Sequence, residues 1–219
     1  MKALIILSGG MDSATALAWA LDQKHEVIAA LNFQYGAKQN QREALSVKAL
    51  TEYYAIPYHP IELGFINTLF KSTLLQSGGA IPEGHYTEES MKSTVVPFRN
   101  GIMLSIAAGA AESLGAHAII LGNHYGDHAT YPDCRSTFIE PMTAAIREGT
   151  DTQIQLLSPF CDLQKSDIAR LGHSLSVPYA LTYTCYKGGE KHCGCCGSCT
   201  SRKEAFHTAG LVDPTDYIS

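Results

Sequence analysis

The sequence predicts an α/β fold built on a doubly wound, mainly parallel five-stranded sheet. Short apolar segments alternate with longer segments of helical composition along the chain. The first apolar segment is continuous, which is typical of a strand buried on both faces of a parallel sheet. The expected strands are residues 3–7, 26–33, 58–62, 117–121 and 153–157. The expected helices are residues 12–23, 40–55, 101–115, 137–148 and 165–174, with a further short helix after residue 63.

Composition narrows the class of protein. The 219 residues are 45% hydrophobic and 17% charged, as in a soluble enzyme with a substantial core. The formal net charge of -5 would repel a nucleic acid, so none is expected as a partner. No secretory signal or membrane-spanning run is recognised, which predicts a cytoplasmic protein. The seven cysteines are then expected to bind a metal rather than to form disulfides.

The loop after the first strand is the strongest motif. Ser8-Gly9-Gly10 interrupts the apolar run, and an Ala- and Leu-rich helix follows, with Asp12 or Ser13 available to cap it. A strand, a tight loop and a helix N-terminus direct backbone N–H groups toward one point, which suits a phosphate. The lysine of a Walker A loop and the third glycine of a dinucleotide fingerprint are absent. The alternative is an ordinary Gly-Gly turn.

The hexapeptide Ser-Gly-Gly-Met-Asp-Ser, residues 8–13, resembles the pyrophosphate-binding loop of the PP-loop ATP pyrophosphatases. Members of that superfamily cleave ATP between the α and β phosphates and transfer AMP to a substrate oxygen. The resemblance implies Mg²⁺ and assigns catalysis to Ser8, Asp12, Ser13 and, further along the chain, Lys165. It also implies a nucleotide-binding stretch of Leu7, Ser8, Gly9, Gly10, Met11, Asp12, Ser13, Ala14, Thr15, Ala16 and Leu17.

Two basic residues, one in a loop and one at a helix start, are candidates for binding phosphate. Arg99 precedes a small, apolar helix, where its guanidinium could bind a phosphate or pair with an acidic group. The superfamily resemblance favours contact with the nucleotide. Lys165 opens a helix, a position where the helix dipole disfavours a positive charge. A residue placed against its local preference is a candidate for function, here as a charge facing ATP phosphates, and the alternative is a solvated lysine.

Three other loops have weaker signals. The turn at 33–36 could contact adenosine or be a solvated turn, and residues 76–94 lack any period and are expected to form a partly mobile lid. His124 and His128 have a spacing that could bind a metal on a helix, but Gly126 lies between them. The loop after the fourth strand is dense in groups that bind flat heterocycles. Its candidate substrate-binding residues are Tyr125, Asp127, Tyr131, Asp133 and Arg135.

A cluster of cysteines lies near the C-terminus. Cys193, Cys196 and Cys199 have two residues between successive members, and Cys185 adds a fourth thiol across a Gly-rich loop. Four thiolates complete a tetrahedral zinc shell at a Zn–S distance of about 2.3 Å, which leaves no open position and makes the site structural. Cys195 is the spare thiol, excluded by the even spacing and the family pattern described next. An iron–sulfur cluster or a reactive dithiol are the alternatives.

The loop and the cysteines together resemble the 7-cyano-7-deazaguanine synthases, almost from end to end. The segments that show this resemblance are Leu7–Ser13, the turn at 33–36, Val96–Asn100, Tyr131–Arg135 and Thr184–Tyr186 with the three later cysteines. The resemblance implies an adenine nucleotide alpha hydrolase-like domain at residues 1–180, a zinc-binding segment at 181–219, and a homodimer.

The activity implied by this resemblance is the ATP-dependent conversion of 7-carboxy-7-deazaguanine and ammonia to the nitrile. The acid and then the amide are adenylated, and AMP and diphosphate are released. No glutaminase motif is recognised, so free ammonia is the expected nitrogen source. The alternatives are a PP-loop tRNA sulfurtransferase, which would want a basic tRNA-binding surface, and a non-enzymatic zinc module, which would not need the phosphate loop.

Overall fold

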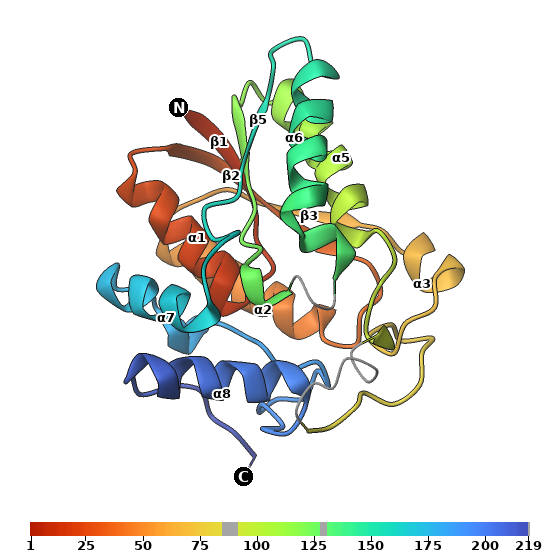
Figure 1. The fold of residues 1–219 in the computed structure, drawn as a ribbon, viewed down its shortest axis with the longest axis vertical. Coiled ribbons are helices and arrows are strands. Elements are labelled where there is room, and N and C mark those ends of the chain that lie inside the picture. Colours follow the sequence, from red (N-terminus) through yellow and green to blue (C-terminus); the bar gives the residue numbers. More distant parts are fainter. Residues whose placement is uncertain (85–91, 128–130, 219) are drawn as a thin grey trace.

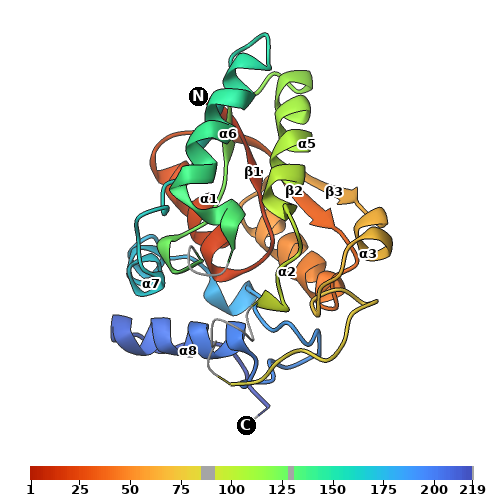
Figure 2. The same ribbon diagram turned by 45° about the vertical axis from the view of Figure 1, so that its right-hand side comes forward.

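The computed structural model describes residues 1–84, 92–127 and 131–218, which form a single sheet flanked by helices (Figures 1 and 2). The sheet has five strands in the order β3-β2-β1-β4-β5, and all four pairings are parallel. The strands are β1 (Lys2–Ile6), β2 (Glu26–Gln34), β3 (Tyr58–Glu62), β4 (Ala118–Ile120) and β5 (Gln155–Leu157). All five predicted strands are therefore confirmed.

The helices follow the strands in α/β alternation. They are α1 (Met11–Asp22), α2 (Asn40–Tyr53), α3 (Phe65–Leu69), α5 (Arg99–Ser113), α6 (Ser136–Glu148), α7 (Lys165–Ser174) and α8 (Gly197–Ala209). The predicted helices are confirmed with small shifts at their ends. Helix α8 was not predicted, because its Gly-, Ser- and Thr-containing sequence has no clear apolar stripe.

Both faces of the sheet are covered, as the apolar strands predict. On β1, Leu4 and Ile6 belong to a core cluster shared with α5 and α6, whereas Ala3 and Ile5 belong to a second cluster shared with α1 and α7. The side chains of a strand alternate between faces, so a continuously apolar strand requires a helical layer on each side. Figure 2 shows the strands between these two layers.

The strand order places a crevice beside the end of β1. Strand β1 pairs with β2 on one side and with β4 on the other, so the chain connections leave in opposite directions from this point. Ligands of open α/β sheets bind outside the carboxyl ends of the strands at such a switch point. The loop at residues 8–10 begins there.

The C-terminal segment lies across the same end of the molecule, with α8 running beside α7 (Figure 1). Arg202 of α8 is fully buried, and it donates three hydrogen bonds to the carboxylate of Asp213 at 3.0–3.1 Å. The same guanidinium donates to the hydroxyls of Thr182 and Thr184 and to the carbonyl oxygen of Tyr179. Within the described part of the chain, no helix is both long and apolar enough to cross a lipid bilayer.

Replacing Arg202 with methionine should destabilise the protein by about 3–5 kcal/mol, because the largely buried carboxylate of Asp213 would lose its cationic partner. Urea unfolding followed by circular dichroism would measure the loss. The matched control is Arg147→Met, which removes an exposed pair with Glu148 and should cost no more than about 1 kcal/mol. Equal losses in the two variants would contradict the role given to Arg202.

Candidate active site

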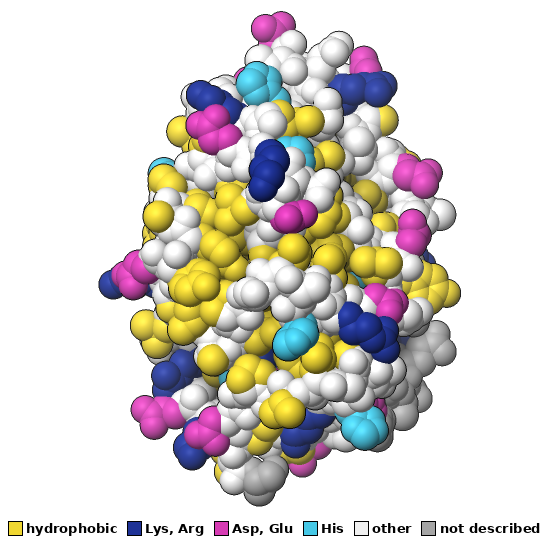
Figure 3. Space-filling model, turned by 90° about the vertical axis from the view of Figure 1, so that its left-hand side faces the viewer, with side chains coloured by type: hydrophobic (Ala, Val, Ile, Leu, Met, Phe, Trp, Pro, Cys, Tyr) yellow, Lys and Arg dark blue, Asp and Glu magenta, His cyan; other side chains and the backbone are white. Residues whose placement is uncertain are grey.

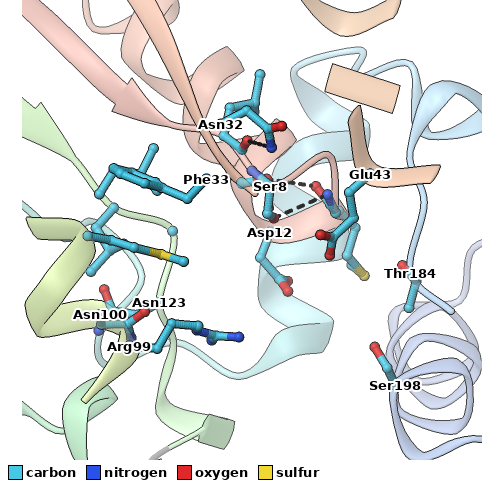
Figure 4. Close-up of a pocket in the computed structure, with 18 of the residues that line it drawn as sticks. Ser8, Asp12, Asn32, Phe33, Glu43, Arg99, Asn100, Asn123, Thr184 and Ser198 are labelled. Atoms are coloured by element: carbon cyan, nitrogen blue, oxygen red, sulfur yellow. Dashed lines mark hydrogen bonds between the residues drawn. The ribbon is translucent and has the colours of Figure 1, made fainter. Parts of the chain in front are cut away.

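A cavity opens at the switch point of the sheet (Figure 4). Its walls come from the loops after β1, β2 and β4, from the first turns of α5 and α7, and from the C-terminal segment. Nine residues chosen from the sequence line it: Leu7, Ser8, Gly10, Met11, Asp12, Ser13, Arg99, Tyr131 and Lys165. The structure thus brings the phosphate-loop candidates, both basic candidates and one aromatic candidate to a single space.

The loop at residues 8–13 is held by its own serines. The backbone N–H of Ser8 donates to Ser13 Oγ at 3.2 Å, and the two hydroxyls lie 3.0 Å apart. Ser13 Oγ also donates to the carbonyl oxygen of Gly10 at 3.2 Å. Gly10 is the N-cap of α1 and no side chain caps this helix, so the prediction of capping by Asp12 or Ser13 was wrong. The uncapped first turn leaves N–H donors for an anion.

The later part of the proposed nucleotide-binding stretch lies inside α1 rather than on the cavity wall. Ala14, Ala16 and Leu17 are fully buried in the core cluster beneath the helix. Thr15 donates to the carbonyl oxygen of Met11 at 2.8 Å, and its hydroxyl lies 2.9 Å from that of Tyr179. These four residues fix the position of the helix that carries the loop.

The conformation of the loop requires glycine at position 9. Its φ is +83°, and a Cβ there would lie 2.9 Å from the carbonyl oxygen of Glu43 and from Cβ of Ser46. Its own carbonyl oxygen accepts a hydrogen bond from the backbone N–H of Tyr183 at 2.9 Å. Only glycine combines this backbone conformation with this close approach.

Asp12 carries the negative charge nearest the loop. Lys165 Nζ lies 3.1 Å from its Oδ2, and His124 Nε2 lies 3.8 Å from the same oxygen. Burial works to raise the pKa of Asp12, but Lys165 and His124 outweigh it and the pKa lies below its usual value. The other oxygen, Oδ1, is buried and has no hydrogen-bond partner among the described residues. An ionised carboxylate with one unused oxygen is suited to a divalent cation.

An unusual backbone conformation just before α5 orients the side chain of Arg99. Phe98 precedes α5 with φ of +54°, and its ring packs edge-on against Phe138. The Arg99 guanidinium donates to the hydroxyl of Tyr35 at 3.1 Å and lies beside that ring. Figure 4 shows it pointing into the cavity opposite Asp12. Arg99, predicted from its loop, and Lys165, predicted from its position at a helix start, therefore line the same cavity.

Asp133, chosen as a substrate ligand, lies elsewhere. Its Oδ2 accepts the backbone N–H of Asn100 at 2.7 Å, and its carbonyl oxygen accepts the amide of Asn100. This carboxylate is buried and caps the first turn of α5, where negative charge is favourable. Asp133 therefore stabilises the start of α5, which carries Arg99, and does not line the cavity.

The other aromatic and polar candidates divide between two places. Tyr131 is buried at the cavity wall, with its hydroxyl 3.2 Å from Thr94 and 3.4 Å from Tyr186. Tyr125 and Arg135 are exposed and are not among the described residues that line the cavity. The side chain of Asp127, the histidine at 128 and residues 85–91 of the expected lid lie outside what the structure describes.

Asn123 joins the loops on the β4 side, and sequence reasoning missed it. Its amide donates to the carbonyl oxygen of Cys134 at 3.0 Å, and its carbonyl oxygen accepts the hydroxyl of Ser158. Cys134 Sγ in turn accepts the amide of Asn100 at 3.2 Å. These bonds tie the ends of β4 and β5 to the start of α5. Position at the carboxyl end of β4 was the available signal.

The four predicted zinc ligands come together. The Sγ atoms of Cys185, Cys193, Cys196 and Cys199 all lie within 4.8 Å of one another, and three of the four residues are buried. Backbone N–H groups support the sulfurs, from Cys193 to Cys185 at 3.4 Å and from Cys196 to Cys193 at 3.2 Å. Hydrogen bonds from the Cys196 and Cys199 thiols hold the pKa of Cys185 well below its usual value. The spacing and the thiol donors fit a tetrahedral metal ion.

This cysteine cluster sits against the cavity. Thr184 lines the cavity and precedes Cys185, and Ser198 lines it between Cys196 and Cys199. Figure 4 shows both hydroxyls on the wall opposite Arg99. Neither was predicted, although their place beside the cysteines was a signal. Asn32 and Glu43 also line the cavity without having been chosen.

The family model and the curated relatives match nearly the whole chain. Residues 2–210 match the family described as "Queuosine biosynthesis protein QueC". The chain belongs to this family. A protein of Porphyromonas gingivalis named 7-cyano-7-deazaguanine synthase is 53% identical over 98% of this chain and 96% of its own length. One of the same name from Desulfotalea psychrophila is 51% identical over 100% of this chain and 99% of its own length.

Solved structures support the fold. An NMN synthetase of Francisella tularensis aligns with a TM-score of 0.51 at 15% identity, over 96% of this chain and 77% of that one. The U34-tRNA thiolase NcsA of Methanococcus maripaludis aligns with a TM-score of 0.52 at 15% identity, over 81% and 57%. At such identities the likeness shows the shared fold alone, an adenine nucleotide alpha hydrolase-like sheet as the sequence predicted.

Replacing Gly9 with alanine should lower the free energy of unfolding by at least about 1 kcal/mol, because φ is positive and the added Cβ meets backbone. Thermal unfolding would measure the change. The control is Gly79→Ala, since nothing lies within 4 Å of a Cβ at that exposed glycine. The interpretation would fail if the two variants were equally stable.

Proposed function

We propose that this protein is an ATP-dependent ligase that converts 7-carboxy-7-deazaguanine and ammonia to 7-cyano-7-deazaguanine. The observation that carries the proposal is the name shared by relatives 51–53% identical over nearly the whole chain. The cavity supports it, because the serine-held loop, Arg99 and Lys165 converge at the switch point of a nucleotide-binding fold. AMP and diphosphate are the expected nucleotide products.

The first half of the reaction makes an acyl adenylate. The substrate carboxylate attacks the α-phosphorus of ATP, the bond between the α and β phosphates breaks, and diphosphate leaves. Uncapped N–H groups at the start of α1 and the Arg99 guanidinium would hold the departing phosphates in place. Mg²⁺ would neutralise phosphate charge, and Asp12 fits it because Oδ1 is buried without a partner.

The second half forms the carbon–nitrogen bond. Ammonia displaces AMP and gives the amide, a second ATP adenylates the amide oxygen, and loss of AMP leaves the nitrile. One cavity would then perform two adenylations, and its residues act by positioning the reactants rather than by forming a covalent link to them. Free ammonia is proposed as the nitrogen source. The net charge of -5 disfavours a tRNA sulfurtransferase, because it opposes tRNA binding.

The four cysteines are proposed to bind a structural Zn²⁺. Four thiol ligands within 4.8 Å leave no position for a substrate, so the ion would fix the segment 181–219 against the domain at 1–180. We place the protein in the cytoplasm, where thiols stay reduced. A homodimer is supported by the apolar side chains gathered in Figure 3 on the face where α1 and α7 run in Figure 1.

The proposed reaction should yield about two AMP for each nitrile formed when the protein is given ATP, ammonia and the 7-carboxy acid. Mass spectrometry of the products measures both. Asp12→Ala should abolish AMP formation while the protein remains folded, because the carboxylate that faces the phosphates is lost. ADP and orthophosphate as the only nucleotide products would refute the proposal, as would unchanged turnover in Asp12→Ala.

Cys193→Ser should lower the zinc content of the purified protein several-fold, since a tetrahedral site with three thiolates binds more weakly. Elemental analysis by mass spectrometry measures the metal. Cys195→Ser is the control, because Cys195 lies next to the cluster but outside it, with its sulfur beside Lys187. Full zinc content in Cys193→Ser, or loss in Cys195→Ser, would show that the ligand assignment is wrong.

A further inference from the structure

The cavity contains a second carboxylate that the reaction described above does not use. Glu43 lies in the first turn of α2 and lines the cavity together with the loop at 8–13. Its backbone carbonyl oxygen is one of the two groups that leave no room for a side chain at Gly9, so the turn that carries Glu43 abuts the phosphate loop. Figure 4 shows its carboxyl group directed into the same space as that of Asp12.

Glu43 is positioned by amides rather than by a cation. Asn40 Nδ2 donates to its Oε2 at 3.2 Å, and Asn40 is itself held because its Oδ1 accepts the backbone N–H of Ala37 at 2.8 Å. Among the described residues Glu43 forms no ion pair, whereas Asp12 lies 3.1 Å from Lys165. The side chain is oriented, and its charge is not neutralised by direct contact.

The charged and titratable groups around Glu43 come from several elements. Arg99 at the start of α5 and Tyr35 just after β2 interact with it electrostatically, and Asp12 and Lys165 line the same cavity. Burial raises the pKa of Glu43 to about 7, against the lowering effects of Arg99, Asn40 and Gln39. Asp12 is shifted the opposite way. Two carboxylates whose surroundings separate their pKa values take different roles in acid–base chemistry.

We propose that Glu43 is the general base of the carbon–nitrogen chemistry, accepting protons from the reacting nitrogen. This inference rests on the proposed function, in which a nitrogen must lose protons both when the amide forms and when the nitrile forms. Asp12 stays ionised toward the phosphates, and Glu43 exchanges protons near neutral pH. No other carboxylate among the described residues lines this cavity.

Protons and electrons balance in both steps that Glu43 would assist, amide formation and nitrile formation. When ammonia attacks the acyl adenylate, a C–N bond forms and Glu43 accepts one proton from the nitrogen. The C–O bond to AMP then breaks, the electron pair leaves with the phosphate oxygen, and the amide remains. After Glu43 has returned its proton to solvent, the adenylated amide loses two protons from nitrogen in turn as the C–O bond breaks, which yields the nitrile and AMP. No oxidant or reductant is needed.

The test compares Glu43→Gln with the wild-type protein in two assays. Exchange of labelled pyrophosphate into ATP, dependent on the 7-carboxy acid and measured without ammonia, reports adenylation alone. Amide formation, measured at constant free ammonia across a pH series, reports amination. General base catalysis contributes about 100-fold to 10,000-fold, so the ratio of amination to exchange should fall by at least about 100-fold in the variant. Glutamine keeps an oxygen for Asn40, which preserves the local fold.

The pH profile gives a second readout that a structural role would not change. In the wild-type protein amination should rise with pH through about 7, because the base must be ionised, and this rise should vanish in Glu43→Gln. The control is Glu52→Gln, an exposed glutamate on the same helix, which should keep both the ratio and the profile.

Three outcomes would overturn the assignment. An unchanged ratio with an unchanged profile would remove Glu43 from the chemistry. An equal fall in exchange and amination would place Glu43 in nucleotide binding instead. Absence of acid-dependent exchange in the wild-type protein would reject the proposed function itself, and the role of Glu43 with it. The last result is seen in the wild-type protein, whereas the first two are seen only in Glu43→Gln, so the failure of the proposed function is distinguishable from the failure of the role given to Glu43.

Discussion

The structure depends on one backbone hydrogen bond, from the N–H of Tyr183 to the carbonyl oxygen of Gly9. Gly9 has a left-handed backbone and no side chain, so no side-chain hydrogen bond can fix the loop at that position. The bond supplies the missing restraint from a distant part of the chain. Tyr183 lies two residues before Cys185, so the position of the loop is coupled to the cysteine cluster.

This coupling gives the cysteine cluster a role beyond local stability. Thr184 is held from three directions: its N–H donates to His192 Nε2 at 2.9 Å, its hydroxyl accepts from Arg202, and the next residue is a predicted zinc ligand. Ser198 is fixed between two more cysteines at the start of α8. A metal ion at this cluster would thus place two hydroxyls on the cavity wall opposite Arg99. Such support is what a site that acts by positioning requires.

Sequence reasoning succeeded where a signal was local. The strands follow from apolar runs, and the loop follows from six consecutive residues. Lys165 was chosen because a lysine opposes the dipole at a helix start, and the structure supplies the reason in its 3.1 Å approach to Asp12. The cysteine spacing and the family pattern likewise predicted the four residues whose sulfurs lie together in the structure.

Sequence reasoning could not assign the role of a residue whose contact partner is distant in the sequence. A carboxylate in a loop of aromatic and polar residues was assigned to substrate, yet Asp133 caps α5 through Asn100, a residue 33 positions earlier. Glu43 is the converse case. In sequence it is one of several polar residues on a surface helix, and it becomes partly buried only when α2 packs against Gly9. The identity of a capping or catalytic carboxylate is set by tertiary contacts that no local pattern encodes.

The buried pair of Arg202 and Asp213 is best understood in the same terms. Replacing a buried ion pair by well-packed apolar groups is often neutral or stabilising, so stability alone is a poor reason for an arginine with no exposed surface. An apolar side chain of similar size could fill the space but could not direct the hydroxyls of Thr182 and Thr184. The guanidinium has donors in a fixed plane, and it uses them to orient the segment that enters the cavity. The charged guanidinium of Arg202 therefore orients the C-terminal segment, whose own apolar core is small.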